Sequence, residues 1–308
     1  MTLLLYTAGS DRTIWLDALK HSFPEARIDD WPSARADETD YALVWKPPAD
    51  LLRALRRAKA IFNLGAGVDA VPDAAVLARE VRLVRLEDAG MAEQMAEYVV
   101  HAVLHCYREF DAYVEQQRRG EWLPRPRLAK SDFVVGILGL GVLGRAVAAA
   151  LAPFKFPLRG WSRTPKRLAG VETSHGLAAL DSFLSGVRLL VCLLPSTSQT
   201  RGLLDRARLS RLPRGAYLVN VSRGALVVDD DLLALLEDAH LAGAMLDVFH
   251  DEPLPATHRF WHHPRVTLTP HVSAVTLIEE SVAQIAAKIR RLEAWLPIGG
   301  IVRHEHGY

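Results

Sequence analysis

The chain has 308 residues, which is enough for two ordinary domains that each bury a core. Its formal net charge at pH 7 is only +1, so nucleic acid or another polyanion is not the expected partner. The apolar stretches are too short for a membrane span or a signal peptide, and we therefore expect a cytoplasmic protein without membrane attachment.

The N-terminal third of the sequence alternates short apolar runs with helical patterns. Helices are predicted from Asp11 onward and from Ala49 to Ala58. Strands that alternate with helices indicate a parallel sheet covered on both faces. The predicted strands are Leu3–Thr7, Tyr41–Trp45, Ala60–Leu64 and Val81–Arg85.

One unusually long helix is predicted next, from Met91 to about Arg118, because this stretch contains neither glycine nor proline. Such a helix bridges two domains or forms a subunit interface. An extended linker should follow it at Pro124–Pro126.

A glycine pattern follows the next apolar run, in the stretch DFVVGILGLGVLG that begins at Asp132. In this pattern Gly139 allows a tight turn, Gly141 lets the backbone approach a pyrophosphate, and Gly144 lets the new helix pack closely on the strand. The first amides of that helix then face an anion. The sequence therefore predicts a dinucleotide-binding site.

The next strand ends without the acidic residue that would bind an adenosine ribose and repel a 2′-phosphate. It ends instead at Trp161, Ser162 and Arg163, with Lys166 and Arg167 close behind. A guanidinium beside a hydroxyl suits a phosphate, which favours NADP(H) over NAD(H). The alternative interpretation is that these cations lie on a solvated loop.

The remaining strands complete a second α/β region. They are predicted at Leu158–Trp161, Leu189–Leu193, Tyr217–Asn220, Ala244–Val248 and Val266–Thr269. A last helix, from about Ala274 to Trp295, should return to the first domain. The predicted fold class is α/β, with two Rossmann-like or flavodoxin-like domains, parallel sheets and an active-site cleft between the domains. Residues 1–100 with 272–308 form the predicted substrate-binding domain, and residues 101–271 the dinucleotide-binding domain.

Four polar clusters follow predicted strands, where ligands of parallel sheets collect. The backbone amides of Leu64–Asp69 could hold a carboxylate, or the segment could be an ordinary tight turn. Arg223 could bind a carboxylate or keto oxygen, or lie on the surface. Asp247 could bond a nicotinamide amide or cap its strand, and Glu252 follows shortly after it. His271, after the last strand, could form an acid/base pair with a carboxylate.

No metal site is predicted. His262 and His263 lack a third ligand at a suitable spacing, and the two cysteines, Cys106 and Cys192, are expected to be reduced core thiols. The arginine-rich stretch from Arg201 to Arg214 has no predicted role beyond a solvated face.

These motifs together resemble the D-isomer-specific 2-hydroxyacid dehydrogenases over nearly the whole chain. The resemblance rests on GAGVD, G-x-G-x-x-G, N-x-x-R-G, LDVF-x-x-EPL and the late PH, in this order. The stretches YALVWKPP, RLEDAGMAEQMAEYV and GWSRT further resemble the bacterial glyoxylate/hydroxypyruvate reductase A subgroup.

The resemblance implies a role for each matching residue. Arg223 would bind the substrate carboxylate and carbonyl, Glu252 would orient the histidine, and His271 would donate the proton. The residues implied to contact the substrate are Ala66 and Gly67, through their amides, with Trp45 and Met91 as pocket walls. Those implied to contact the cofactor are Gly139, Gly141, Val142, Leu143, Gly144, Ser162, Arg163, Leu194, Pro195, Val221, Ser222 and Asp247.

The implied function is the NADPH-dependent reduction of glyoxylate and hydroxypyruvate by a cytoplasmic homodimer. Two alternatives stay open at this point. One is an NAD-dependent reductase of a bulkier 2-oxo acid, and the other is a nucleotide-sensing binding protein without turnover.

Overall fold

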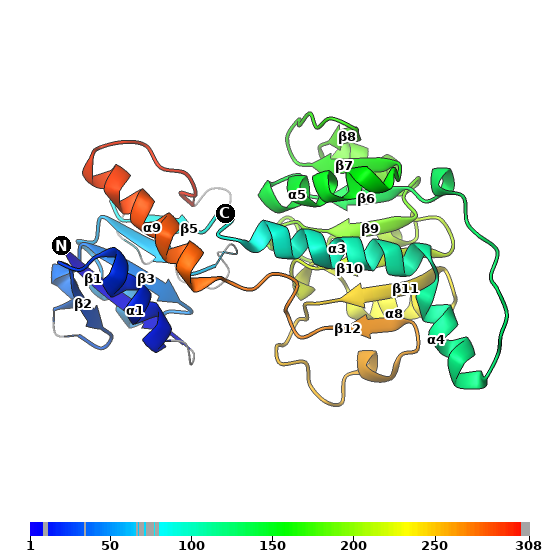
Figure 1. The fold of residues 1–308 in the computed structure, drawn as a ribbon, viewed down its shortest axis with the longest axis horizontal. Helices are drawn as coiled ribbons and strands as arrows, with labels where there is room; N and C mark the ends of the chain where they lie inside the picture. Colours follow the sequence, from blue (N-terminus) through cyan, green and yellow to red (C-terminus); the bar gives the residue numbers. More distant parts are fainter. Residues whose placement is uncertain are drawn as a thin grey trace. The chain divides into compact units, whose positions relative to one another are not determined.

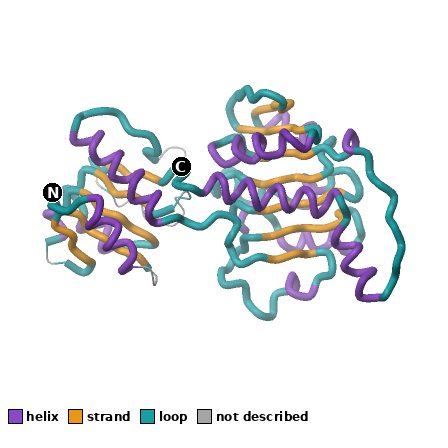
Figure 2. Tube along the Cα trace, in the orientation of Figure 1, coloured by secondary structure: helices purple, strands orange, loops and turns teal. Residues whose placement is uncertain are grey.

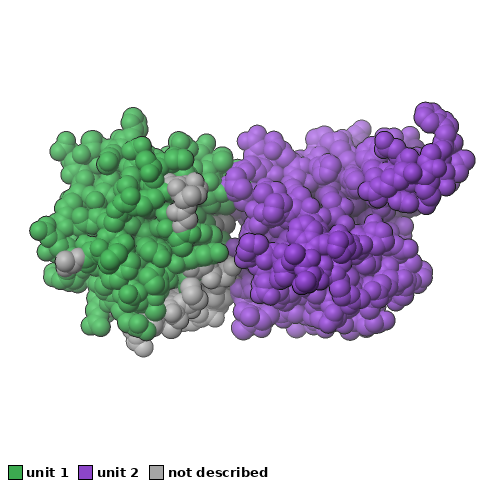
Figure 3. Space-filling model, turned by 90° about the horizontal axis from the view of Figure 1, so that it is seen from below, with its two compact units in different colours: residues 1–91, 276–308 green, residues 92–275 purple. Residues whose placement is uncertain are grey.

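The structure is a computed structural model that describes residues 1–8, 12–33, 35–65, 67, 71, 77 and 80–302. The chain divides into two compact units, residues 1–91 with 276–308 and residues 92–275 (Figure 3). The sequence predicts the domain boundaries at 100/101 and 271/272, and the structure places them at 91/92 and 275/276. Among the described residues, every helix is too short or too polar to traverse a lipid bilayer.

Unit 1 is built on a parallel five-stranded sheet with the strand order β2-β1-β3-β4-β5 (Figure 1). Helices α1 and α9 lie side by side on one face of this sheet. The elements of unit 1 are β1 (Thr2–Thr7), α1 (Arg12–Ser22), β2 (Arg27–Asp30), β3 (Tyr41–Trp45), α2 (Ala49–Ala54), β4 (Ala60–Asn63), β5 (Arg82–Arg85) and α9 (Ile278–Glu293).

Unit 2 is built on a parallel seven-stranded sheet with the order β12-β11-β10-β9-β6-β7-β8. Figure 2 shows its strands with helices alongside them. The strands are β6 (Val135–Leu138), β7 (Leu158–Ser162), β8 (Val171–His175), β9 (Leu189–Cys192), β10 (Ala216–Asn220), β11 (Leu241–Leu246) and β12 (Val266–Leu268). The helices are α3 (Met91–Tyr107), which begins at the last residue of unit 1, α4 (Phe110–Arg119), α5 (Val142–Leu151), α6 (Leu180–Leu184), α7 (Arg206–Leu209) and α8 (Asp229–Glu237).

The seven-stranded sheet separates two apolar cores. Along β10, Ala216 and Leu218 pack into one core while Tyr217 and Val219 pack into the other, as the alternation of side chains along a strand requires. The first core includes side chains of α6 and α8, and the second includes side chains of α3 and α5. Cys192 and Cys106 lie in these two cores as free, buried thiols. The prediction of two α/β domains with parallel sheets is thus confirmed.

The predicted helix from Met91 to Arg118 is wrong in one respect, because it is two helices. The first ends at Tyr107, and Glu109 takes a left-handed conformation with φ 51° before α4 begins at Phe110. Glu109 is held there by an ion pair of 2.8 Å between its carboxylate and Arg125. The helix thus ends beside a tertiary contact, and no glycine or proline marks the break in the sequence.

Smaller differences between the prediction and the structure concern the edge strands of the sheets and the ends of two helices. Strands β2 and β8 were not predicted, because each pairs with a single neighbour and carries a largely polar sequence. Helix α2 ends four residues before the predicted Ala58 and α9 starts four residues after the predicted Ala274, at Ile278.

Candidate active site

The strand order of unit 2 reverses at β6, whose two neighbours are β9 and β7. Chain connections leave the carboxyl ends of β6 and β9 in opposite directions, which opens a ligand-binding crevice in sheets of this kind. The segments that follow β6, β7, β9, β10, β11 and β12 carry the predicted residues of unit 2.

The glycine turn after β6 has the shape that a dinucleotide requires. Gly139 has φ +116°, and a Cβ on Gly144 would lie 1.9 Å from the Gly139 carbonyl oxygen, so α5 packs directly against the turn. In contrast, apart from Gly141 itself and its chain neighbours, no atom of the described residues lies within 4 Å of a Cβ built on Gly141. The turn therefore keeps an open approach in front of the first amides of α5, at Val142 and Leu143.

The end of β7 carries the residues predicted to choose the cofactor. Ser162 is buried, and its hydroxyl donates to the Thr164 carbonyl at 2.9 Å, which bends the chain after the strand. Arg163 is exposed on this bend. The position therefore presents a guanidinium where an acid would repel a 2′-phosphate.

The ends of β9 and β10 are joined by hydrogen bonds. The Ser222 hydroxyl donates to the Leu194 carbonyl, and the Val221 amide donates to the Cys192 carbonyl at 3.4 Å. Three predicted cofactor residues, Leu194, Val221 and Ser222, are thereby brought together. Pro195 follows them on the exposed side.

Arg223 is positioned by its neighbours in the same segment. The Asn220 side chain donates to the Arg223 carbonyl at 3.0 Å, and the Arg223 guanidinium donates to the Ser222 carbonyl at 2.6 Å. A Cβ on Gly224 would lie only 2.0 Å from the carbonyl carbon of Phe249. The backbone after β10 thus packs directly on the backbone after β11, which leads to Glu252.

His271 and Glu252 form a hydrogen-bonded pair. His271 Nδ1 lies 2.7 Å from Glu252 Oε2, and Glu252 Oε1 accepts the Phe249 amide at 3.0 Å. The carboxylate only accepts, which assigns the proton of the pair to Nδ1. His271 Nε2 is then the ring atom available to a substrate. His271 has φ 55°, and backbone strain of this kind concentrates at functional sites.

Asp247 holds the His271 segment in place. Its fully buried carboxylate accepts the amides of Val272 and Ser273, both at 2.8 Å, and the Thr269 hydroxyl at 2.6 Å. The Asp247 carbonyl accepts the His271 amide at 2.9 Å. These contacts favour the strand-capping interpretation of Asp247, while its contact with a nicotinamide stays a prediction.

The predicted substrate residues lie in unit 1. The Trp45 ring covers Gly65, where an added Cβ would approach it to 2.6 Å, and Met91 is buried at the start of α3. Gly67 accepts a hydrogen bond through its carbonyl, and Ala66 lies outside the described residues.

Comparison with known proteins gives the family. Residues 100–273 match the NAD binding domain of the D-isomer specific 2-hydroxyacid dehydrogenases, which is more than half of the chain. The chain belongs to this family.

Solved structures of other 2-hydroxyacid dehydrogenases match the whole chain. One from Xanthobacter autotrophicus, in complex with NADPH and MES, is 39% identical, covers 100% of this chain and 99% of its own, and has a TM-score of 0.94. The NADPH-dependent glyoxylate/hydroxypyruvate reductase of Sinorhizobium meliloti, in complex with NADP and sulfate, is 35% identical with the same coverage and a TM-score of 0.91. A probable 2-hydroxyacid dehydrogenase from Rhizobium etli, in complex with NADP, HEPES and L(+)-tartaric acid, is 32% identical, with the same coverage and a TM-score of 0.92.

Within this dehydrogenase, sequence reasoning missed several residues that support the site. The buried Asn63 amide donates to the Gly65 carbonyl at 3.0 Å and to the Gly67 carbonyl at 2.7 Å, and so fixes the loop after β4. The Tyr98 hydroxyl lies 2.7 Å from Thr269, and burial raises the pKa of Tyr98. A polar residue that ends an apolar strand, as Asn63 does, was the signal available for the first of these.

Other polar groups of the sequence lie outside the site. In the arginine-rich stretch, Arg208 donates to the Leu203 carbonyl at 3.1 Å and Arg214 to the Asp238 carbonyl at 2.8 Å. Within the part of the chain that the structure describes, no group of three His, Cys, Asp or Glu side chains can hold a metal ion.

Proposed function

We propose that this dehydrogenase reduces small 2-oxo acids with NADPH, and that glyoxylate and hydroxypyruvate are its substrates. The observation that carries the proposal is the 2.7 Å hydrogen bond between His271 and Glu252, which leaves Nε2 of an oriented imidazole for the substrate. The choice of substrate and cofactor is supported by the similar reductase of Sinorhizobium meliloti and by the relatives crystallised with NADP or NADPH.

The residues present fit the dinucleotide. Gly141 leaves room for a pyrophosphate, which Val142 and Leu143 would contact through their amides, and Arg163 would contact the 2′-phosphate. Ser162 would lie beside this phosphate, the adenosine would contact Leu194 and Pro195, and the nicotinamide would lie near Val221, Ser222 and Asp247. When bound, the reduced nicotinamide supplies a hydride to the carbonyl carbon of the acid.

Side chains of the site stabilise the charge that develops on the substrate and supply the proton that the reaction requires. Negative charge develops on the carbonyl oxygen during reduction, and the Arg223 guanidinium stabilises it. His271, in its protonated form, donates the proton on Nε2 to this oxygen, while the Glu252 carboxylate keeps the ring oriented through Nδ1. We assign the substrate carboxylate to the amides of Ala66 and Gly67, with Trp45 and Met91 as walls.

The test is a steady-state comparison of NADPH and NADH oxidation with glyoxylate, hydroxypyruvate and pyruvate. We expect NADPH oxidation with the first two acids, and we expect His271→Ala to lower turnover by about a hundred- to ten-thousand-fold with NADPH affinity retained. His262→Ala, at an exposed histidine of the same unit, is the matched control. A preference for NADH would remove the cofactor assignment, and tight NADPH binding without any turnover would favour a nucleotide sensor.

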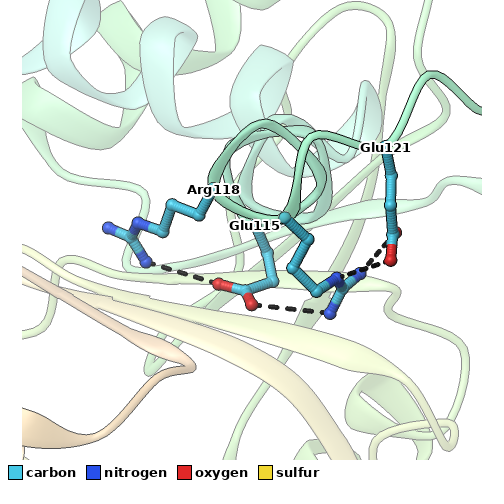
Figure 4. Close-up of polar contacts among 4 residues, drawn as sticks. Glu115, Arg118 and Glu121 are labelled. Carbon is cyan, nitrogen blue, oxygen red and sulfur yellow. Dashed lines mark hydrogen bonds and ion pairs between the residues drawn. The ribbon is translucent and has the colours of Figure 1, made fainter.

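We also propose a homodimer formed through α4 and the segment after it. Exposed apolar side chains gather in this part of the chain, and Trp122 is 97% exposed. Four charged side chains of the same segment are paired with one another, Glu115 with Arg118 and Arg119 at 3.5 and 3.4 Å, and Arg119 with Glu121 at 2.9 Å (Figure 4). A second copy can therefore cover the apolar side chains while these four charged side chains keep their partners.

The oligomeric state tests this second proposal. Light scattering should give the mass of a dimer for the wild-type protein and of a monomer for Trp122→Asp. Trp295→Asp is the matched control, because Trp295 is 95% exposed and lies in unit 1. A wild-type monomer, or an unaffected Trp122→Asp dimer, would contradict the assignment.

A further inference from the structure

A cluster outside the proposed catalytic residues joins two of the segments that carry them. Its members are Asp229, the first residue of α8, and His250 and His258, which lie on the segment after β11. Figure 1 shows β10, β11 and α8 close together in unit 2. A cavity of about 440 Å³ is lined by these three side chains together with Arg201 and Asp230.

The shortest contact of the cluster crosses between the two segments. His250 Nε2 lies 2.9 Å from the Val227 carbonyl oxygen, which can only accept, so Nε2 carries the proton. Val227 lies four residues after Arg223, and His250 lies two residues before Glu252. One hydrogen bond thus fastens the Arg223 segment to the Glu252 segment.

Asp229 strengthens this connection from α8. Its two carboxylate oxygens lie 3.7 Å from His250 Nε2 and 3.5 Å from His258 Nε2. His258 Nδ1 accepts the Phe260 amide at 3.3 Å, which leaves the proton of the neutral ring on Nε2, toward Asp229. Burial raises the pKa of Asp229, and the two histidines oppose this effect. The Asp229 carboxylate therefore faces the ring N–H groups of His250, which precedes Glu252 in the sequence, and of His258, which follows it.

The packing between the segments leaves little freedom at the point where they touch. A Cβ on Gly224 would lie 2.0 Å from the Phe249 carbonyl carbon and 2.4 Å from the His250 nitrogen. The backbones touch next to Arg223, and the His250 side chain secures the same junction from the cavity side. Phe249, the residue before His250, also donates its amide to Glu252, so this junction is connected directly to the Glu252–His271 pair.

We propose that His250 is a positioning residue, which with Asp229 and His258 sets the placement of Glu252 and His271 relative to Arg223. This inference rests on the proposed reductase function, because it concerns the distance between Arg223, which stabilises the alkoxide, and His271, which donates the proton. The proposed role is exerted through Glu252 and requires no contact with the substrate. Misplacement of catalytic groups by about 1 Å is enough to cost up to about a hundredfold in rate.

The test compares two substitutions of one residue that faces a cavity rather than the core. His250→Gln keeps an N–H donor that can reach Val227, and His250→Leu removes it. We expect His250→Leu to lower kcat about 5- to 20-fold, to leave the NADPH dissociation constant within about twofold, and to raise the primary isotope effect with deuterated NADPH. His250→Gln should recover kcat to within about threefold of wild type. Loss of thermal stability alone, with kcat and the isotope effect unchanged, would overturn the proposal.

Controls separate the cluster from general surface effects. His262→Leu and Asp230→Asn should behave as wild type, whereas Asp229→Asn should lower kcat in the same direction as His250→Leu. Asp229 and Asp230 are neighbours with the same charge, and Asp230 has a side chain that is 91% exposed. An equal effect of Asp229→Asn and Asp230→Asn would assign the change to charge and contradict the positioning role.

Hydrogen exchange distinguishes a failure of this inference from a failure of the reductase function. In His250→Leu, amides of the Arg223 segment, residues 221–228, should exchange faster together with those of residues 247–258. Faster exchange in both segments supports the connection even if the wild-type protein reduces none of the acids. Faster exchange confined to residues 247–258 would refute it.

Discussion

Two glycines of the turn before α5 separate cofactor binding from packing. A Cβ on Gly144 would lie 1.9 Å from the Gly139 carbonyl oxygen, a backbone atom that cannot rotate away. The space beside Gly141, as far as the described chain defines it, is open, and its φ of −76° suits alanine. Gly144→Ala should therefore damage the protein, and Gly141→Ala should damage only the binding of the dinucleotide.

The expected sizes follow from the contacts. Overpacking costs about 1–3 kcal/mol, and alanine recovers up to about 1 kcal/mol of helix propensity at position 144. A net loss of about 1–2 kcal/mol lowers the melting temperature of a unit of this size by about 2–8 °C. At Gly141 the melting temperature should stay within about 1 °C, whereas the methyl group meets the pyrophosphate and weakens NADPH binding at least about tenfold.

Two measurements on each variant decide the matter, the melting temperature without cofactor and the NADPH dissociation constant from fluorescence titration. Gly141→Ala with wild-type affinity would show that no pyrophosphate approaches this turn. Gly144→Ala with an unchanged melting temperature would show that the close contact with Gly139 is not stabilising.

Four further predictions can be tested independently. Arg163→Ala should weaken NADPH at least about tenfold more than NADH in fluorescence titrations, and equal losses would refute the 2′-phosphate contact. Hydrogen bonding to Lys59 lowers the pKa of the Glu293 carboxyl in the folded protein. The stabilisation from this contact is therefore present at a pH above the pKa of this carboxyl in the unfolded chain, and it is lost as the pH falls through its pKa in the folded protein. Glu293→Gln should lower stability in urea at pH 7 and have little effect near pH 3. Burial raises the pKa of Cys192 to about 12, so thiol reagents should label it only after unfolding. Asn63→Leu should raise the KM for 2-oxo acids with NADPH affinity unchanged, and an unchanged KM would separate its loop from substrate binding.

Most elements could be predicted because their apolar residues are continuous and bounded by turn residues. The strand Tyr41–Trp45 was predicted with the bounds that the structure gives. The break at Glu109 could not be predicted, since the local sequence favours a helix and the contact of Glu109 with Arg125, 16 positions away, leaves no local signal. Edge strands such as β8 could not be predicted for a related reason. A strand that pairs with only one neighbour does not need a continuous apolar run.

Site residues could be located from the sequence more easily than their geometry. The motifs place Glu252 and His271 after neighbouring strands, β11 and β12, and this adjacency brings them within reach. The sequence does not show that Phe249 holds the other carboxylate oxygen, or that Gly224 touches Phe249. The first is a hydrogen bond from a backbone amide to a side chain within a tight bend, and the second is a backbone contact between segments about 25 residues apart. Neither leaves a periodic signal in the sequence.

The fully buried Asp247 shows why a motif residue need not touch a ligand to shape the site. A buried carboxylate is costly unless hydrogen bonds compensate it, and the Val272 and Ser273 amides and the Thr269 hydroxyl do so here. The same hydrogen bonds fix the chain on both sides of His271, whose left-handed φ of 55° would otherwise be unfavourable. The free energy that compensates the charge thus also holds the imidazole against Glu252, so stability and placement of the proposed proton donor depend on one carboxylate.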